Sequence, residues 1–567
     1  MAFQLSPGVL VTEKDLTNVI PAVSTSAGAF VGQFNWGPAE QIFTVGSEND
    51  LKKHFGLPLA PSDWFTAANF LGYGNNLQLV RACGSTAKNA CATGTAPYIP
   101  NQDVYEASFF AGSNSVGPVA AKYPGTYGNT LKVEFADATS FDGWAYAAYF
   151  DGAPGTSAQA ASVGCSNDEL HIIVIDTLGR FTGSTNTVLE TFPFASKQFG
   201  NKLADGTNNY YKEVLNQQSQ YIWWMDHPTS RNWGAAASTA FEGTESDNQT
   251  VGQDPLSITL SGGVNGTAST ADIQDGYALF ANKEIVDISL VLTGAHTADV
   301  VNYAIDNVAL ARLDCVVFFS PPLAAVYNNS GSEAAHVVDY RQSTGEYDGT
   351  GIGRNTSYAV MDSGWKRQYD RYNDQYINVP LNADTAGLCA RTDQTNDAWW
   401  SPAGFNRGQI KNVVKLIWSP DQTERDTLYK NGVNPVTTFP GEGTLLYGDK
   451  TLLAKPSAFD RINVRRLFIV LEKAIATAAK YQLFEFNDVF TRAQFRSMVE
   501  PFLRDVRGRR GIYDFRVVCD ETNNTGEVID RNEFVADIYI KPARSINFIY
   551  LNFVAVRTSV SFTEVGA

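Results

Sequence analysis

IVDISLVL at residues 285–292 and CVVFFS at residues 315–320 are continuous apolar runs of strand length. Between them, residues 297–312 carry apolar side chains at helical spacing, at Val300, Val301, Ala304, Val308 and Ala311. Strands that are apolar on both alternations are typical of parallel sheets covered by helices on both faces. Residues 285–320 therefore predict a strand–helix–strand unit of an α/β fold.

The same alternation occurs near the start of the chain. Residues 27–33 (AGAFVGQ) and 77–81 (LQLVR) predict buried strands. Residues 47–55 (SENDLKKHF) predict a short helix with Ser47 as its N-cap. We therefore expect one α/β core domain, formed by residues 23–95 and 251–400.

Residues 96–250 have a different composition. They are rich in Gly, Ser, Thr, Asn and aromatic residues, with strand-like runs at 131–135, 144–150 and 171–175. They contain 7 Lys and Arg against 16 Asp and Glu, a net charge of −9. We expect an inserted, mostly β domain whose acidic surface faces the solvent.

Residues 401–567 have the pattern of a separate α+β domain. A helix is predicted over residues 463–481, and a second helix runs from a capping box of Thr491 and Gln494 to Gly508. Two strand runs, 513–518 and 534–540, predict a hairpin. The final run, residues 545–556, has large apolar side chains on both alternations, so we expect both of its faces to be buried.

A change of charge sets the C-terminal block apart. Residues 451–567 contain 17 Lys and Arg against 14 Asp and Glu, a net of +3, which leaves 26 against 45 for the preceding residues, a net of −19. A basic module on an acidic body indicates a surface for an acidic partner. The candidates are the arginines off the apolar stripe of the second helix and at its end: Arg492, Arg496, Arg504, Arg507, Arg509 and Arg510. The alternative is a solvated face in which Glu500 pairs with Arg496 and Arg504.

No set of residues has the spacing of a known catalytic or metal site. The five histidines are at least 40 residues apart and the six cysteines form no CxxC pair, so we expect no metal and no cofactor. Asp287, His296 and Ser320 could suggest a catalytic triad, but Ser320 lies in Ser-Pro-Pro without a Gly-x-Ser-x-Gly turn. We therefore expect structural residues at strand ends and no enzyme.

The start of the chain, its apolar runs and its net charge argue against a secreted, membrane-spanning or DNA-binding protein. The start, MAFQLSPGV, lacks the regions of a signal peptide, and no apolar run approaches the ~20 residues that cross a bilayer. A net charge of −16 argues against nonspecific DNA binding.

Residues 1–22 predict an extended arm, which at ~3.3 Å per residue reaches about 60–70 Å. Such an arm is long enough to contact a neighbouring molecule.

Several long motifs resemble the major tail sheath protein family of contractile-tailed bacteriophages. They are LSPGVLVTE (5–13), GAFVGQFNWGPAEQ (28–41), FLGYGNNLQLVRA (70–82), LSGGVNG (260–266), PLNADTAGLCARTD (380–393), WWSPAGFNRGQI (399–410) and LYGDKT (446–451). The resemblance extends through the C-terminal block and covers roughly three quarters of the chain. In residues 96–250 only short pieces such as YPGTYGN (123–129) are similar.

The resemblance implies a structural subunit with no enzymatic activity. Its core, 23–95 and 251–400, would be subtilisin-like without a catalytic triad, 96–250 an inserted outer domain, and 401–567 an inner domain that faces a tail tube. The arms would add strands to neighbouring subunits through Pro7, Gly8, Val9, Leu10 and Val11 at one end and Ile546, Phe548, Tyr550, Val554 and Val556 at the other.

The resemblance also implies the function and the partners. Subunits would polymerise as stacked hexameric rings around the tail tube in an extended metastable state, and contraction would drive the tube through the host cell envelope. Partners would be further copies, the tail tube protein, and baseplate and tail terminator proteins, with no nucleic acid and no membrane anchoring. The protein would belong to the virion and assemble in the host cytoplasm. The alternative is the sheath of a phage-derived contractile bacteriocin or injection system.

Overall fold

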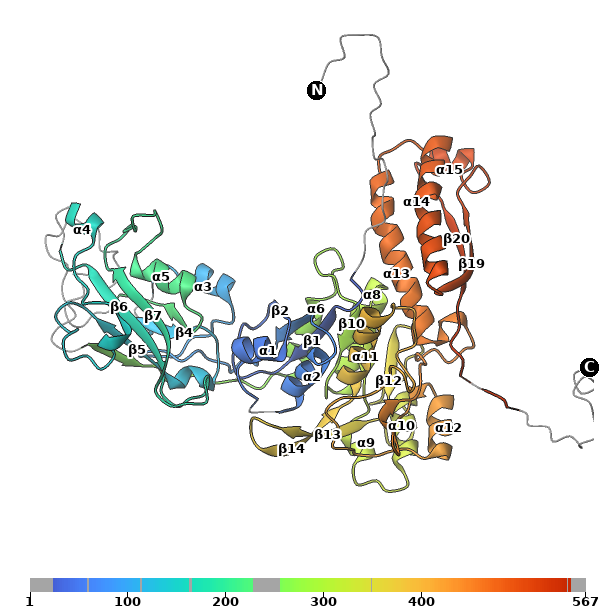
Figure 1. Cartoon of the computed structure of the whole chain (residues 1–567), viewed down its shortest axis with the longest axis horizontal. Helices are drawn as coiled ribbons and strands as arrows, with labels where there is room; N and C mark the ends of the chain where they lie inside the picture. The colour runs from blue at the N-terminus through green and yellow to red at the C-terminus, as the bar shows by residue number, and fades with distance from the viewer. Residues whose placement is uncertain are drawn as a thin grey trace, which may run out of the picture. The chain divides into compact units, whose positions relative to one another are not determined.

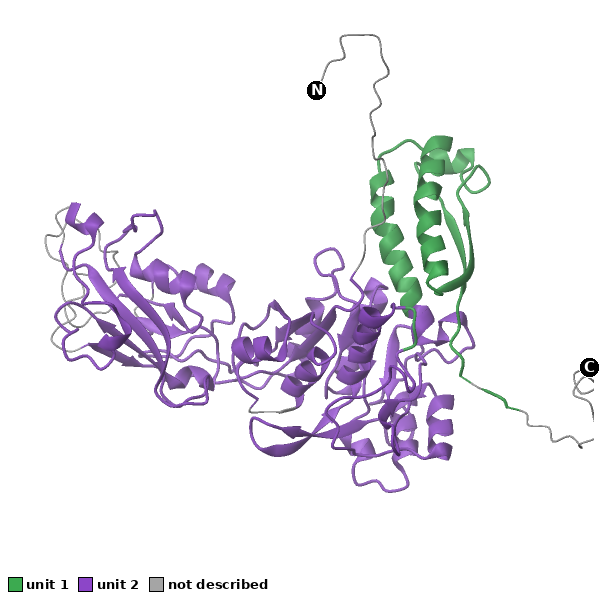
Figure 2. Cartoon of the chain, in the orientation of Figure 1, with its two compact units in different colours: residues 1–21, 399–401, 466–567 green, residues 22–398, 402–465 purple. Residues whose placement is uncertain are grey.

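A computed structural model of the 567-residue chain describes residues 24–58, 61–112, 115–162, 166–227, 255–347, 349–547 and 549–551. The chain divides into two compact units (Figure 2). The described part of the smaller unit comprises residues 399–401 and those from 466 onward, and the larger unit comprises the described residues of 22–398 and 402–465. The four-part division predicted from the sequence is finer than these two units and stays a prediction.

A seven-stranded sheet forms the centre of the larger unit (Figure 1). Its strands, in spatial order, are β16 (Val433–Asn434), β12 (Ala359–Asp362), β11 (Val316–Phe319), β10 (Leu290–Leu292), β1 (Gly28–Gly32), β3 (Leu77–Arg81) and β2 (Ile42–Val45). All neighbouring strands are parallel except β2, which pairs antiparallel with β3. A mostly parallel sheet is therefore present as predicted, with β1, β3 and β11 at the predicted places, whereas β2, β12 and β16 were not predicted.

Helices cover both faces of this sheet. On one face, Val31 and Val291 pack in one apolar cluster with Tyr277 of α6 and Val300 of α7. The opposite face is covered by α2 and α11, which contact β1, β10 and β11. These helices are α6 (Thr270–Ala278), α7 (Ala298–Tyr303), α2 (Pro61–Leu71) and α11 (Asn382–Thr395). Burial on both faces explains why these strands are apolar on both alternations.

Two local predictions in this region are only partly right. The strand predicted from Ile285 begins at Leu290, and Ile285 is 80% exposed. The helix predicted over 297–312 forms as α7, a π-helical segment (Ala304–Ala309) and α8 (Leu310–Arg312). The short helix at the start of the chain is α1 (Glu48–Phe55), and Ser47 caps it as predicted, since its side chain accepts from Asp50 N at 3.1 Å.

Between β3 and β10 the chain builds a mostly β part with its own apolar cluster. A four-stranded antiparallel sheet has the order β7 (Thr187–Ser196), β6 (Glu169–Asp176), β5 (Leu131–Ala136) and β9 (Leu256–Thr259). Beside it lie β4 (Val119–Ala121), β8 (Ile222–Trp224), α3 (Gln102–Ser108), α4 (Ala158–Ser162) and α5 (Tyr211–Gln218). The strand predicted over residues 144–150 is wrong, because Trp144 turns inward to donate to Glu134 Oε2 at 2.7 Å and a 3₁₀ turn follows.

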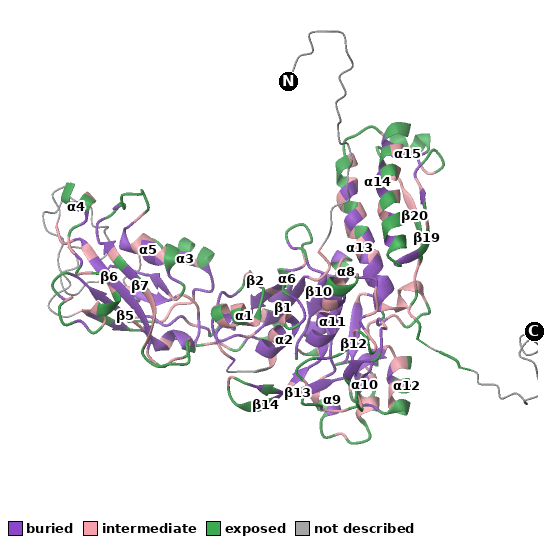
Figure 3. Cartoon of the chain, in the orientation of Figure 1, coloured by how far each residue is buried: buried purple, intermediate pink, exposed green. Residues whose placement is uncertain are grey.

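A three-stranded sheet, a two-stranded sheet and three further α-helices complete the described part of the larger unit. A three-stranded sheet has the order β14 (Gln375–Pro380), β13 (Trp365–Asp370) and β15 (Lys415–Leu416), and β17 (Val436–Phe439) pairs with β18 (Gly443–Leu446). The helices are α9 (Leu323–Val326), α10 (Glu333–Gln342) and α12 (Gln422–Lys430). Residues 402–465, assigned from the sequence to the C-terminal block, thus contribute β16 to the central sheet. Figure 3 shows that buried residues concentrate in the central strands and α11.

The smaller unit packs two helices against a hairpin. Its elements are α13 (Ile462–Ala479), which begins in the larger unit, α14 (Val489–Gly508), β19 (Ile512–Val518), α15 (Gly526–Asp530) and β20 (Asp537–Pro542). β19 and β20 form the predicted antiparallel hairpin. The predicted capping box at Thr491 is wrong: α14 begins two residues earlier, because the Asp488 carboxylate accepts from Thr491 N at 2.8 Å.

Candidate assembly surfaces

The residues that could suggest a catalytic triad contact separate partners. Ser320 Oγ donates to Asp362 Oδ2 at 2.8 Å and accepts from Asn382 N at 3.0 Å. His296 Nε2 lies 2.8 Å from the carbonyl oxygen of Val31, and Asp287 is exposed ahead of β10. Burial raises the pKa of Asp362 to about 8. These hydrogen bonds connect the ends of β11 and β12 to α11.

A second buried polar group joins β13 to α11. Lys366 Nζ forms an ion pair with Asp384 Oδ1 at 2.8 Å, and both side chains are fully buried. Tyr73 OH donates to the same carboxylate oxygen at 3.0 Å, and Lys366 Nζ also donates to the carbonyl oxygen of Lys411 at 2.9 Å. Burial lowers the pKa of Lys366 and raises that of Asp384. The pair and its hydrogen bonds connect four separate stretches of the larger unit.

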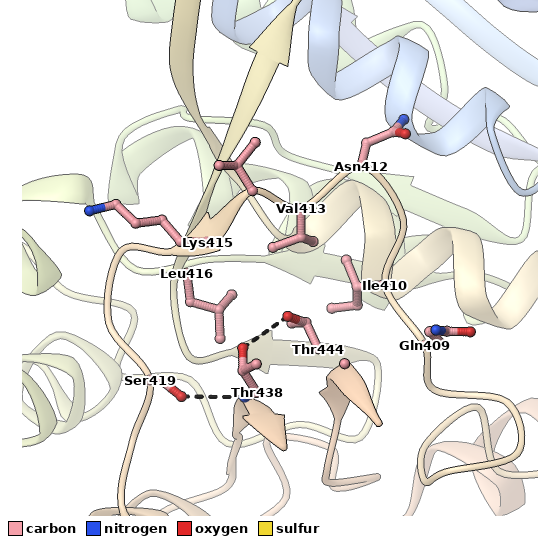
Figure 4. A pocket seen from close by; sticks show the side chains of 11 residues that line it. Gln409, Ile410, Asn412, Val413, Lys415, Leu416, Ser419, Thr438 and Thr444 are labelled. Atoms are coloured by element: carbon pink, nitrogen blue, oxygen red, sulfur yellow. Dashed lines mark hydrogen bonds between the residues drawn. The ribbon is translucent and has the colours of Figure 1, made fainter. Parts of the chain in front are cut away.

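A hollow of about 600 Å³ lies between β15 and the β17–β18 pair (Figure 4). Apolar side chains of Ile410, Val413 and Leu416 line it, and Thr438 Oγ1 and Thr444 Oγ1 are hydrogen-bonded at 2.9 Å on its opposite side. Lys415 is the charged residue of this lining. The hollow therefore offers packing surface rather than a set of acid–base groups.

The six candidate arginines differ in exposure. Arg492 is buried, and its Nε donates to the carbonyl oxygen of Asp488 at 3.0 Å, so it supports the start of α14. Arg496 is half-buried, and the exposed members are Arg504, Arg507, Arg509 and Arg510. The structure thus separates one buried arginine from a mostly exposed group along α14 and at its C-terminal end.

Three of the four exposed arginines make contacts within the smaller unit that were not predicted from the sequence. Arg507 and Asp514 approach to 3.7 Å, and Arg509 and Asp505 to 3.8 Å. The guanidinium groups of Arg509 and Arg510 lie 5.4 Å from the ring centroids of Trp399 and Trp400, respectively. The adjacent tryptophans at 399 and 400 are a visible signal in the sequence, but nothing local predicts that they contact residues 110 positions away.

The alternative of a helix face neutralised by Glu500 is not what the structure contains. In the described smaller unit, neither Arg496 nor Arg504 forms an ion pair with Glu500 within 4 Å. The positive charge along α14 is therefore only partly compensated by its own acidic neighbours, at Asp505 and Asp514.

The segment that follows β20 leaves the hairpin with its apolar side chains exposed. Ile546 is 81% exposed and Tyr550 is 86% exposed, although the sequence predicted burial on both faces. Within the described chain, β19 and β20 pair with each other and with no further strand, so the outer edges of this small sheet are open. The other predicted arm residues, 7–11, Phe548, Val554 and Val556, lie outside the described residues.

Comparisons with known proteins agree with this architecture and reveal the family. The family described as phage tail sheath protein central domain matches residues 266–452, and the phage tail sheath C-terminal domain family matches residues 454–555. The tail sheath protein of Vibrio phage KVP40 is 35% identical over 99% of both chains, and that of Enterobacteria phage T4 is 34% identical over 99% of both. The chain belongs to the phage tail sheath family.

Solved structures show the same fold in distant sheath proteins. A sheath tail protein from Listeria innocua superposes with a TM-score of 0.53 at 11% identity, over 92% of this chain and 96% of that one. The anti-feeding prophage helical sheath in its contracted state gives a TM-score of 0.51 at 12% identity, over 98% and 99%. The protein is thus a structural subunit of a contractile tail sheath and, as a tail component, part of the virion.

No helix in the described ranges of this sheath subunit has the length and apolarity to span a membrane. In the same ranges, no group of three or more His, Cys, Asp and Glu side chains is arranged to hold a metal ion.

Proposed function

We propose that this sheath subunit polymerises helically around a tail tube, as stacked hexameric rings in an extended metastable state. Contraction of the lattice then drives the tube through the host envelope for genome delivery. The observation that carries the proposal is the exposed apolar segment after β20, next to a two-stranded sheet with open edges. The central strands β1, β10, β11 and β12 are fully buried within the chain, and we propose that another copy covers this exposed segment in the same way.

Strand addition is the physical basis of the proposed lattice. A two-stranded hairpin alone is marginally stable, and an extended segment that pairs with its open edge gains backbone hydrogen bonds that need little side-chain identity. We propose that residues 546–556 and the N-terminal arm, residues 7–11, supply these strands to neighbouring copies. Such pairing survives rigid-body movement of the subunits, because the linker absorbs the movement while the strands stay paired.

Five arginines of α14 and its C-terminal end, one half-buried and four exposed, are the proposed contact with the tail tube. Arg496, Arg504, Arg507, Arg509 and Arg510 present a positive surface on an acidic protein, which favours association with an acidic partner. Arg492 is buried and serves the helix start instead. The tube protein is therefore proposed to carry acidic side chains where it meets α14.

We also propose a role in the sheath for each of the regions predicted from the sequence. The core of residues 23–95 and 251–400 would be a subtilisin-like fold without its catalytic function, and residues 96–250 an outer insertion. Residues 401–567 would form the inner part of the sheath. Baseplate and tail terminator proteins would bound the polymer, which would assemble in the host cytoplasm without nucleic acid.

The sheath of a contractile bacteriocin or injection system is the second candidate. The similarity to the anti-feeding prophage sheath is of fold alone, at 12% identity. The phage proteins match over nearly the whole of both chains at 34–35% identity, which favours a phage tail.

Truncation tests the arm hypothesis. Deleting residues 1–20 or residues 546–567 is expected to leave soluble subunits that no longer polymerise, as measured by sedimentation and electron microscopy. The thermal melting of the larger unit serves as the internal control and should be unchanged. Long, regular sheaths formed by both truncated proteins would refute the proposal.

A further inference from the structure

The loop that joins α13 to α14 exposes an unusual set of apolar side chains. We name residues 481–490 the aromatic tip; its exposed members are Tyr481, Leu483, Phe484, Phe486, Val489 and Phe490. Phe484 is fully exposed and has a φ of +70°, a conformation that is costly for a bulky residue. Contiguous exposed apolar surface of this kind marks an interaction site.

The aromatic tip is surrounded by negative charge. Asn487 Nδ2 donates to Asn524 Oδ1 at 3.1 Å and to the carbonyl oxygen of Glu533 at 2.8 Å, which joins the tip to the connection between β19 and β20. Figure 1 shows α15, within this connection, beside the start of α14. Residues 480–490 and 519–533 contain seven acidic side chains and two basic ones, a net charge of −5.

The opposite end of the same unit is basic. Residues 504–514 and 541–544 contain six basic and two acidic side chains, a net charge of +4. Ala543 N donates to the carbonyl oxygen of Gly511 at 3.1 Å, so the two stretches lie together; we name them the basic end. The 20 residues of α14 separate the two ends by about 30 Å. The smaller unit is therefore polarised along α14.

We propose that the aromatic tip of one sheath subunit docks on the basic end of the smaller unit in a second copy. Apolar contact with Tyr513, which is 66% exposed within that end, would bury the tip, and the opposite charges would fix the orientation. A symmetric contact of two tips would place −5 against −5. The contact is therefore head-to-tail, which generates a ring or an open helical polymer rather than a two-fold dimer.

This inference rests on the proposed self-assembly, and a charge swap tests it in tube-free polymerisation. The tip variant Glu485→Lys with Glu527→Lys and the basic-end variant Arg510→Glu with Arg544→Glu should each raise the critical concentration at least tenfold. Combining all four substitutions should restore it to near the parent value. The control Asp142→Lys with Asp151→Lys makes the same change of charge at exposed residues of the β-rich part and should have little effect.

A second pair of variants separates apolar contact from charge. Phe484→Ser with Phe486→Ser should raise the critical concentration without lowering the melting temperature, because both side chains are exposed. Tyr149→Ser removes a similarly exposed aromatic ring elsewhere and should change neither. The inference would be overturned if the tip variant and the basic-end variant polymerised like the parent protein. It would also be overturned if the protein with all four charge substitutions failed to regain assembly. A parent protein that forms no polymer would contradict the proposed function instead.

Discussion

The sheets of the two units differ in how far the rest of the chain covers them. The seven-stranded sheet is covered on both faces, and buried hydrogen bonds of Ser320 with Asp362 and Asn382 join the ends of β11 and β12 to α11. The hairpin of β19 and β20 has open edges and exposed tyrosines at 513 and 539, and it continues into an exposed apolar segment. The first sheet buries its central strands within the chain, whereas we propose that the second is extended by strands from other copies.

This difference indicates a division of labour within a contractile sheath. A complete core can move as a rigid body, because its contacts are internal and two-sided. An incomplete sheet provides a link that other copies of the chain can complete. Changes in the first region should therefore alter the unfolding of the subunit, and changes in the second should alter assembly while unfolding stays the same.

The largest expected effect on unfolding comes from breaking the buried ion pair. Lys366→Ala leaves the Asp384 carboxyl buried without its partner, which typically costs about 3–5 kcal/mol. Thermal or urea unfolding of the larger unit measures the loss. Arg354→Ala breaks an exposed pair with Asp306 and should cost less than about 1 kcal/mol. Equal effects of the two substitutions would show that the core is not held in the way described.

The next largest expected effect is a pH dependence of the free energy of unfolding of the larger unit. Burial raises the pKa of Asp362 to about 8, so the folded state keeps its proton between about pH 4 and 8 while the unfolded state releases it. Stability from this group is therefore greatest below pH 4 and falls as the pH rises toward 8, by on the order of a few kcal/mol.

Melting curves from pH 5 to 8 check this dependence. Asp362→Asn should flatten the curve, since the amide does not titrate, and should leave polymerisation of the folded subunit unchanged. A variant with the same slope as the parent protein would assign the dependence to other groups.

Charge reversal on α14 should act on assembly alone. Arg504→Glu with Arg507→Glu is expected to weaken co-sedimentation with tail tubes by roughly tenfold, about 1.4 kcal/mol, and the loss should shrink at high salt because exposed charges are screened. The melting temperature should stay near the parent value. Because Arg504 and Arg507 also belong to the basic end, tube-free polymerisation is expected to weaken as well, and binding of unpolymerised subunits to tubes isolates the tube contact. Lys202→Glu with Lys283→Glu reverses two charges at exposed residues of the larger unit and is the matched control. Unchanged tube binding at low salt would contradict a tube-facing α14.

The central sheet was predictable from the sequence because its signal is local. Continuous apolar runs predicted strands at 27–33, 77–81 and 315–320, and β1, β3 and β11 lie within these ranges. The open hairpin was also predictable from its two β-prone runs. The order of the strands and the pairing of β9 with β5 could not be predicted from the sequence, because they depend on contacts between residues far apart in the chain.

The polar contacts were the least predictable part of the molecule. Tyr73 reaches Asp384 across 311 positions, and Arg510 meets Trp400 across 110, so no spacing rule applies. The exposed ends of the smaller unit were partly visible in the sequence as charge. Its polarity emerged only when β19, β20 and α14 brought acidic residues to one end and basic residues to the other.

The smallest expected effect concerns the start of α14. Asp488→Ala removes the carboxylate that accepts from Thr491 N and should lower the stability of the smaller unit by about 1 kcal/mol. Asp488→Asn retains a cap and should cost much less, which separates capping from charge. The melting temperature of the smaller unit measures both. If the asparagine variant is as unstable as the alanine variant, the negative charge at the helix N-terminus, rather than the cap geometry, stabilises the start of α14. Since both substitutions remove the same acidic charge from the aromatic tip, any weakening of polymerisation should be equal in the two proteins.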